Sequence, residues 1–244
     1  LKITISNPSK RNAFDPDMML ELSNALTELD MNPELRVGVL TAEGEHFTAG
    51  LDMPKFFGPG ANPTPIPEEN VSVFGLGKTC SKPIVTAMQG ISFTIGIEMA
   101  LAGDIIIAAD DCRFCQMEAK RGIAPLGGAH FRYVSRSGWG NAMYHLMLCD
   151  EFGAEEAYRV GLVQEVVATG TQIERAMEIA RIISQNAPLG IQATKAAGRK
   201  YIEAGEASAV NAIDDIRARV MSSQDAAEGI QSFVERRAAV FVGR

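Results

Sequence analysis

Two glutamates, Glu98 and Glu118, have a placement in this chain that could support chemistry. Glu98 is the one acidic residue in the apolar run Ile97–Ala102, and Glu118 precedes the glycine-containing stretch Gly122–Gly128. Burying an unpaired carboxylate costs free energy or raises its pKa. Each carboxyl group is therefore either satisfied by structural hydrogen bonds or poised for proton transfer, and both interpretations stay open at this point.

The elements that must position these glutamates alternate between strand and helix patterns. Around the pair, the sequence predicts a strand over Lys82–Gly90, a glycine-containing turn over Ile91–Gly96, a helix over Ile97–Ala102 and a buried strand over Asp104–Ala109. Before it, we expect strands over Leu1–Ile5 and Arg36–Thr41, a helix capped by Asp15 with Pro16 at its first position, and a short helix over Glu68–Lys78.

After the pair, strand signals fade and helical periodicity takes over. A helix with one apolar face is predicted over Thr171–Asn186, and only helices are predicted beyond it. This order indicates an α/β core over residues 1–186 and a C-terminal helical region over residues 187–244. Such a tail has a small core of its own, so we expect it to pack on the core domain or on a neighbouring subunit.

Composition narrows the classes of function. With a formal net charge of −7, the chain of 244 residues does not favour nucleic-acid binding. The apolar stretch Ile84–Ala109 is interrupted by Gln89, Glu98 and Asp104, which argues against a membrane span. Leu1 already lies in a strand pattern, so we expect a few residues to precede it.

Cysteines and loops offer two weaker signals. Cys112 and Cys115 have CxxC spacing, but there is no second pair and no nearby histidine, so we interpret them as buried thiols in a reducing compartment such as the cytoplasm. No metal site is predicted. The proline-rich stretch Gly58–Pro67 is either a flap over a pocket or a tolerated surface loop.

Seven motifs, in order along essentially the whole chain, resemble the crotonase family, the enoyl-CoA hydratase/isomerase superfamily. They are Asn7–Ala13, Phe47–Asp52, Lys82–Gly90, Glu98–Asp104, Gln116–Gly128, Glu155–Val163 and Phe233–Arg237. The resemblance implies a crotonase-like spiral of repeated ββα units, a C-terminal trimerisation region, and a homotrimer or a hexamer made of two trimers. It also implies an acyl-CoA thioester as substrate, with no separate cofactor.

The family's chemistry assigns roles to residues of this chain. The backbone N–H groups of Leu51 and Ile95 would hold the enolate oxygen of the thioester, one such donor being worth about 3 kcal/mol. Glu98 and Glu118 would flank a water, with Glu118 as the acid and Glu98 as the base. Many hydratases have a run of glycines where this chain has Phe93–Gly96, so Ile95 is a departure that crowds the pocket.

The resemblance also places the coenzyme A moiety. Lys10 and Arg11 match the adenine and phosphate corner, together with Ala49 and Asp52 of the first oxyanion motif and Met53 directly after it. Arg237 is expected to contribute from a neighbouring tail.

Several alternatives remain beside enoyl-CoA hydration. An enoyl-CoA isomerase would use Glu118 alone as base, and a CoA-thioester binder would show no significant turnover. His46, His130 and His145 suggest a Ser–His hydrolase, but no GxSxG elbow is present. No GxGxxG follows the first strand, which argues against a nicotinamide dehydrogenase.

Overall fold

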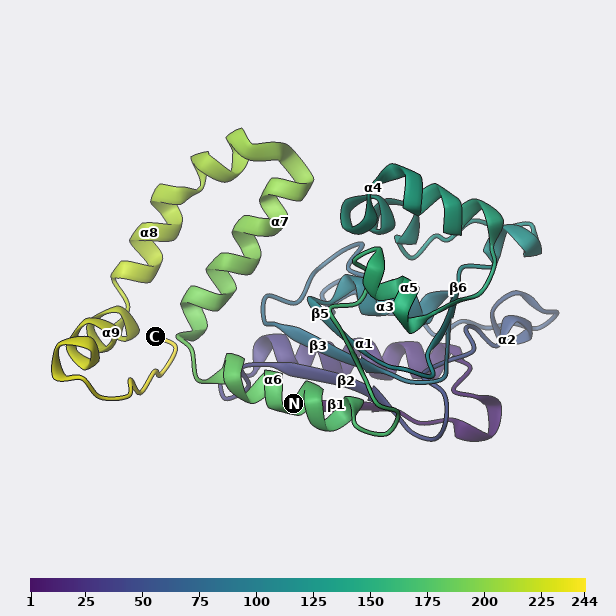
Figure 1. Ribbon diagram of the computed structural model, residues 1–244, viewed down its shortest axis with the longest axis horizontal. Helices are drawn as coiled ribbons and strands as arrows, with labels where there is room; N and C mark the ends of the chain where they lie inside the picture. Colours follow the sequence, from purple (N-terminus) through teal and green to yellow (C-terminus); the bar gives the residue numbers. More distant parts are fainter.

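The computed structural model describes residues 1–244 and is built on a parallel sheet of five strands in the order β1-β2-β3-β5-β8 (Figure 1). Their bounds are β1 Lys2–Ile5, β2 Gly38–Ala42, β3 Ile84–Met88, β5 Ile105–Ala109 and β8 Glu165–Val167. Every residue of β2 and β3 is buried, because helices cover both faces of the sheet. Strand β1 alternates exposed and buried residues, as predicted.

A second, smaller sheet contains β4 (Ile91–Phe93), β6 (Arg113–Cys115) and β7 (Phe152–Gly153). Strand β3 leads directly into β4 and then into α3 (Ile95–Ala102), and β5 leads through β6 into α4 (Ala129–Leu148). This repetition of strand, strand and helix is the predicted ββα spiral. The prediction of a turn over Ile91–Gly96 was wrong, because β4 pairs in parallel with β6.

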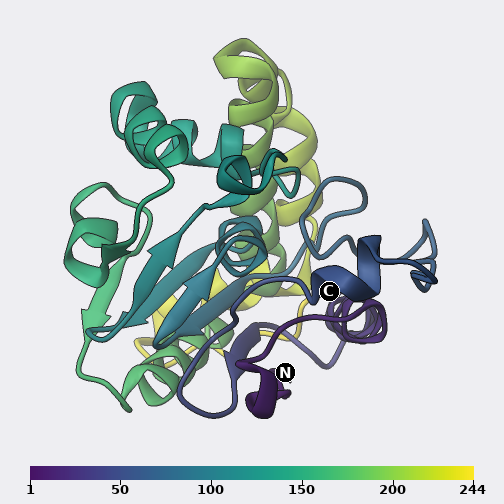
Figure 2. The same cartoon turned by 90° about the vertical axis from the view of Figure 1, so that its right-hand side faces the viewer.

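Helices enclose the large sheet from both sides. Helix α1 (Pro16–Met31) covers one face, and Asp15 caps it by accepting a hydrogen bond from the Met18 N–H at 3.0 Å, as predicted. Helix α6 (Gln172–Ser184) covers the other face, where Ala176 and Ala180 join a small core of strand residues. Figure 2 shows α4 and the light-green first part of the C-terminal helical region rising from the same side of this core, while the yellow last helix lies behind the sheet.

The C-terminal helices extend away from the sheet (Figure 1). They are α7 (Pro188–Asn211, broken at Gly205), α8 (Ile213–Met221) and α9 (Gln224–Glu235). A salt bridge of 2.7 Å from Lys195 to Asp104 ties α7 to the core. No residue of α7 or α8 is fully buried within the chain, so their apolar side chains stay partly or fully exposed in a single copy.

One predicted helix is absent. The stretch Glu68–Lys78 forms turns, with Val71 and Val73 buried and the Ser23 hydroxyl donating to the Val71 carbonyl at 2.7 Å. These contacts with α1 are long-range and replace a local helix. The short helices are η1 Pro8–Lys10, α2 Met53–Phe57, η2 Glu118–Arg121 and α5 Ala154–Arg159. None of the helices combines the length and apolar character that a membrane span requires.

All four cysteines are buried as free thiols. Burial raises the pKa of Cys112 to about 12 and that of Cys115 to about 11. Thiols held in the neutral form are poor nucleophiles, in line with the interpretation of this CxxC pair as buried structural thiols.

Candidate active site

Two backbone N–H groups, those of Leu51 and Ile95, have no hydrogen-bond acceptor within the chain. Phe14 pairs with the residues on either side of Leu51: its N–H donates to the Gly50 carbonyl at 2.9 Å, and its carbonyl accepts from the Asp52 N–H at 2.7 Å. The Leu51 N–H therefore points away from Phe14. Ile95 begins α3, where first-turn N–H groups have no partner inside the helix. Both donors are free to bind a ligand oxygen.

Backbone hydrogen bonds hold the segment before Leu51 beside the segment before Ile95. The Thr48 N–H donates to the Ile91 carbonyl and the Phe93 N–H donates to the Thr48 carbonyl, both at 3.0 Å. Gly50 has φ 107°, and a Cβ atom there would lie 2.5 Å from Thr94 Oγ1, so only glycine fits. Thr94 itself has φ 49°, a left-handed conformation that costs free energy in a β-branched residue. The strain sits directly before the Ile95 donor.

Glu98, on α3, is almost completely buried, with 2% of its surface exposed. The Ala129 N–H, at the start of α4, donates to Glu98 Oε1 at 3.0 Å. A Cβ atom on Gly127 would come within 2.4 Å of Glu98 Oε2, so glycine is required for this close approach. Burial raises the pKa of Glu98, and the backbone hydrogen bonds from Ala129 and Gly127 oppose that rise.

Glu118 lies at the start of η2 and is 7% exposed. Burial, with a further contribution from the charge of Glu98, raises the pKa of Glu118 to about 7. With the amide of buried Gln116 oriented so that its nitrogen faces Glu118, that nitrogen donates to both carboxylate oxygens at 2.7 and 3.0 Å, which opposes the rise in the pKa of Glu118. Gln116 was not singled out from the sequence as a separate site residue; its place two residues before Glu118 was the available signal.

The two carboxyl groups therefore share one buried environment but differ in their partners. Both carboxyl groups accept hydrogen bonds, Glu98 from backbone N–H groups and Glu118 from the Gln116 amide, and burial together with the charge of Glu98 gives Glu118 the larger rise in pKa. Two titratable groups with pKa values pushed apart can act as a base and an acid at the same pH. Their titrations are coupled, so the apparent pKa values belong to the pair.

The predicted coenzyme A corner comes together at the surface. The Ala49 N–H donates to the Arg11 carbonyl at 2.9 Å, and Lys10 Nζ pairs with Asp52 Oδ2 at 2.9 Å. Met53 follows as the first residue of α2. Lys10 and Arg11 are exposed, but Asp52 already neutralises part of this positive charge.

Arg237 lies apart from this corner. It follows α9, which lies at the opposite end of the molecule from α2 (Figure 1). Its guanidinium pairs with Glu228 and with Glu235. Within one chain Arg237 does not join Lys10, so a role at the coenzyme requires a neighbouring subunit.

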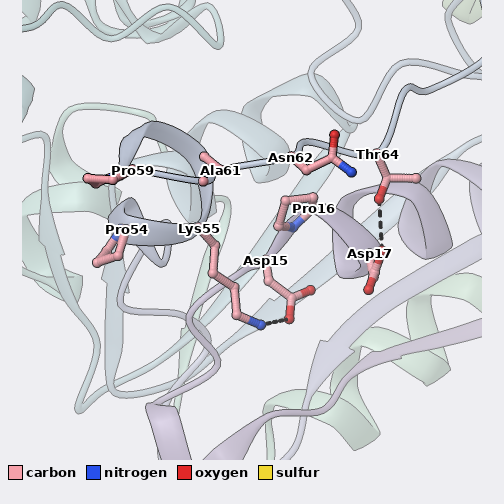
Figure 3. Close-up of a pocket in the computed structure, with 10 residues that line it drawn as sticks. Asp15, Pro16, Asp17, Pro54, Lys55, Pro59, Ala61, Asn62 and Thr64 are labelled. Carbon is pink, nitrogen blue, oxygen red and sulfur yellow. Dashed lines mark hydrogen bonds and ion pairs between the residues drawn. The ribbon is translucent and has the colours of Figure 1, made fainter.

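A polar pocket lies beside α2, under part of the predicted flap (Figure 3). Lys55 pairs with Asp15 at 2.6 Å, and the Thr64 hydroxyl donates to Asp17 at 2.8 Å, which tethers the loop to the start of α1. The residues that line this pocket do not include Glu98, Glu118, Leu51 or Ile95. It adjoins the coenzyme corner through α2 and is separate from the carboxyl pair.

Comparisons with known proteins give a consistent picture. The family model described as "Enoyl-CoA hydratase/isomerase" matches residues 1–244. The enoyl-CoA hydratase EchA19 of Mycobacterium tuberculosis is 31% identical, over 100% of this chain and 93% of that protein. A carnitinyl-CoA dehydratase of Salmonella typhi is 34% identical, over 100% and 95% respectively. A crystal structure from Mycobacterium abscessus superposes with a TM-score of 0.95 at 41% identity, covering 100% of this chain and 95% of that chain.

Proposed function

The chain belongs to the enoyl-CoA hydratase/isomerase family, and from this premise we propose that it hydrates 2-enoyl-CoA to 3-hydroxyacyl-CoA. The observation that carries the proposal is the pair of buried carboxyl groups, Glu98 and Glu118, held in one environment with different hydrogen-bond partners. Hydration needs a base for the water and an acid for the carbon, and this pair supplies both. Coenzyme A is part of the substrate, and no separate cofactor is proposed.

The proposed reaction follows from the placement of these groups. Glu98 takes a proton from water as the water oxygen bonds to C3, and the electrons of the double bond move to the thioester oxygen. The N–H groups of Leu51 and Ile95 hold that enolate oxygen. The enolate then collapses and C2 takes a proton from Glu118. The positive end of α3 lies at Ile95 and adds to the stabilisation.

Two alternatives remain. An isomerase would need one base, so the second buried carboxyl group favours hydration. The relative named carnitinyl-CoA dehydratase also favours it, since dehydration is the reverse of hydration. A silent CoA-thioester binder would have no need to bury two carboxyl groups at a cost in stability.

A direct assay tests the proposal. Mixing the protein with crotonyl-CoA is expected to remove the ultraviolet absorbance of the conjugated thioester and to form 3-hydroxybutyryl-CoA, identified by mass spectrometry. A rise in absorbance with a 3-enoyl-CoA, without loss from crotonyl-CoA, would favour the isomerase instead. No change with either substrate, while CoA thioesters still bind, would favour the binder.

The pH dependence has opposite signs for hydration and isomerisation. Hydration requires Glu118 protonated, so kcat/KM for crotonyl-CoA is expected to fall as the pH rises through about 7. An isomerase with Glu118 as base would gain activity over the same interval. Rates measured between pH 5 and 9, with stability checked at each pH, distinguish the two reactions.

We also propose that the protein assembles as a homotrimer or as a hexamer of two trimers. Apolar side chains of the C-terminal helices are exposed in a single chain, including Ile202, Ile230 and Phe233, the last at 85%. Exposed apolar surface of this kind is expected to be covered by another subunit. Light scattering coupled to gel filtration is expected to give three or six copies per particle, and a monomer at micromolar concentration would contradict this assembly.

A further inference from the structure

A fully buried tyrosine lies on α4, the helix whose first residue contacts Glu98, and is not used by the reaction proposed above. Tyr133, on α4, has 0% of its surface exposed, and its hydroxyl has no hydrogen-bond partner in the protein. Leaving a buried hydroxyl unpaired lowers the stability of the folded protein. Buried polar groups without a protein partner are uncommon, and in a reaction site such a group is a candidate to bind a ligand atom.

The helix geometry directs this side chain toward the carboxyl pair. Tyr133 lies one turn after Ala129, the residue whose N–H holds Glu98 Oε1 at 3.0 Å. Long side chains in a helix point back toward its N-terminus, over the residue four positions earlier. The phenol ring of Tyr133 therefore extends toward the end of α4 that contacts Glu98.

The electrostatics agree with this direction. Burial raises the pKa of Tyr133 well above its ordinary value, and the negative charges of Glu118, Cys115 and Glu98 raise it further. Both glutamates therefore contribute to the electrostatic environment of the Tyr133 hydroxyl. The group keeps its proton throughout the working pH range, which makes it a permanent hydrogen-bond donor.

We propose that the Tyr133 hydroxyl is a third polar group of the reaction site and donates a hydrogen bond to the oxygen atom that joins C3. This inference rests on the proposed hydration. During that step one lone pair of the water attacks C3, one of its protons passes to Glu98, and its second lone pair accepts from Tyr133. In the product the same hydrogen bond is made to the 3-hydroxyl group.

Tyr133→Phe is the variant that tests this role, since it removes the hydroxyl and keeps the ring. We expect kcat/KM for crotonyl-CoA to fall about ten- to hundredfold, while the melting temperature stays equal or rises because no hydroxyl is left unpaired. Tyr144→Phe, on the same helix but with Tyr144 59% exposed, is the matched control and is expected to have no effect. Wild-type kcat/KM in Tyr133→Phe would overturn the proposal, as would a loss of activity that only follows a loss of stability.

A binding measurement separates this inference from the proposed function. Calorimetry with 3-hydroxybutyryl-CoA and butyryl-CoA, in a Glu118→Gln background that prevents turnover, compares ligands that differ by the 3-hydroxyl. The hydroxylated ligand is expected to bind about five- to tenfold more tightly, and Tyr133→Phe to abolish that preference. An unchanged preference would overturn the role of Tyr133 even if hydration is established. A preference lost in the variant would support the contact even if the wild type turned over no enoyl-CoA.

Discussion

Glu118→Gln is expected to lower hydratase turnover by about 10³-fold, because it removes the acid that delivers a proton to C2. Binding of CoA thioesters should be nearly unchanged, since Gln occupies the same volume and the N–H donors of Leu51 and Ile95 remain. Glu155→Gln, an exposed position on α5, is the matched control and should behave as wild type. Unchanged turnover in Glu118→Gln would remove Glu118 from the mechanism.

The same substitution is expected to increase stability at alkaline pH. Glu118 has a folded-state pKa of about 7, raised from 4.5, so the native protein binds more protons than the unfolded chain between these values. Its contribution to the free energy of unfolding is fully present below about pH 4.5 and is lost as the pH rises through 7. Above that, Glu118→Gln should be more stable than wild type by at most about 3 kcal/mol.

Chemical denaturation at pH 5 and pH 8 measures this difference. The stability gain of the variant should be small at the lower pH and larger at the higher one. A variant that is less stable than wild type at pH 8 would show that the Glu118 carboxylate is well satisfied when charged, with the two hydrogen bonds from Gln116 as the obvious cause. Such a result would favour Glu118 as a base.

Ile95→Pro is expected to lower kcat by about 10²- to 10³-fold, because proline lacks the N–H that would hold the enolate. Ile95 is the first residue of α3, a position that accepts proline without loss of a helical hydrogen bond. Ile95→Ala keeps the N–H and is the matched control for the loss of the side chain. The ratio of kcat between these two variants isolates the donor.

The activity of Ile95→Ala also tests the effect of having isoleucine where many hydratases have a run of glycines. If Ile95→Ala exceeds wild-type activity on longer acyl chains, the Ile95 side chain limits the pocket. Equal activity of Ile95→Pro and Ile95→Ala, with circular dichroism unchanged, would contradict a role for this N–H.

Local sequence patterns predicted most of the framework that positions the site. The cap at Asp15, the buried strands and the α6 helix each depend on neighbouring residues, and the structure has them close to the expected bounds. Strand β4 was missed because three residues carry too little periodicity, and its pairing with β6 is long-range. The prediction of a helix over Glu68–Lys78 was also wrong because of a long-range contact. The Val71 carbonyl accepts a hydrogen bond from Ser23 of α1, which local sequence patterns do not reveal.

The sequence identified Glu98 and Glu118 as candidate site residues, but it could not predict the hydrogen-bond partners around their carboxyl groups. Nothing local in the sequence places Ala129 against Glu98, because that contact joins α3 to α4. Tyr133 gave no signal of its own for the same reason, being one aromatic residue in a helical stretch. Its relation to the glutamates appears only when α4 packs against α3.

The most direct test of the account is the fate of the water oxygen. The protein is incubated with crotonyl-CoA in oxygen-18-labelled water, and the acyl product is analysed by mass spectrometry. We predict one labelled oxygen at C3, with the label absent in Glu118→Gln over the same time. Recovery of crotonyl-CoA with no labelled product would contradict hydration, and conversion of 3-butenoyl-CoA to crotonyl-CoA in the same water, without incorporation of the label, would establish isomerisation as the reaction of this site.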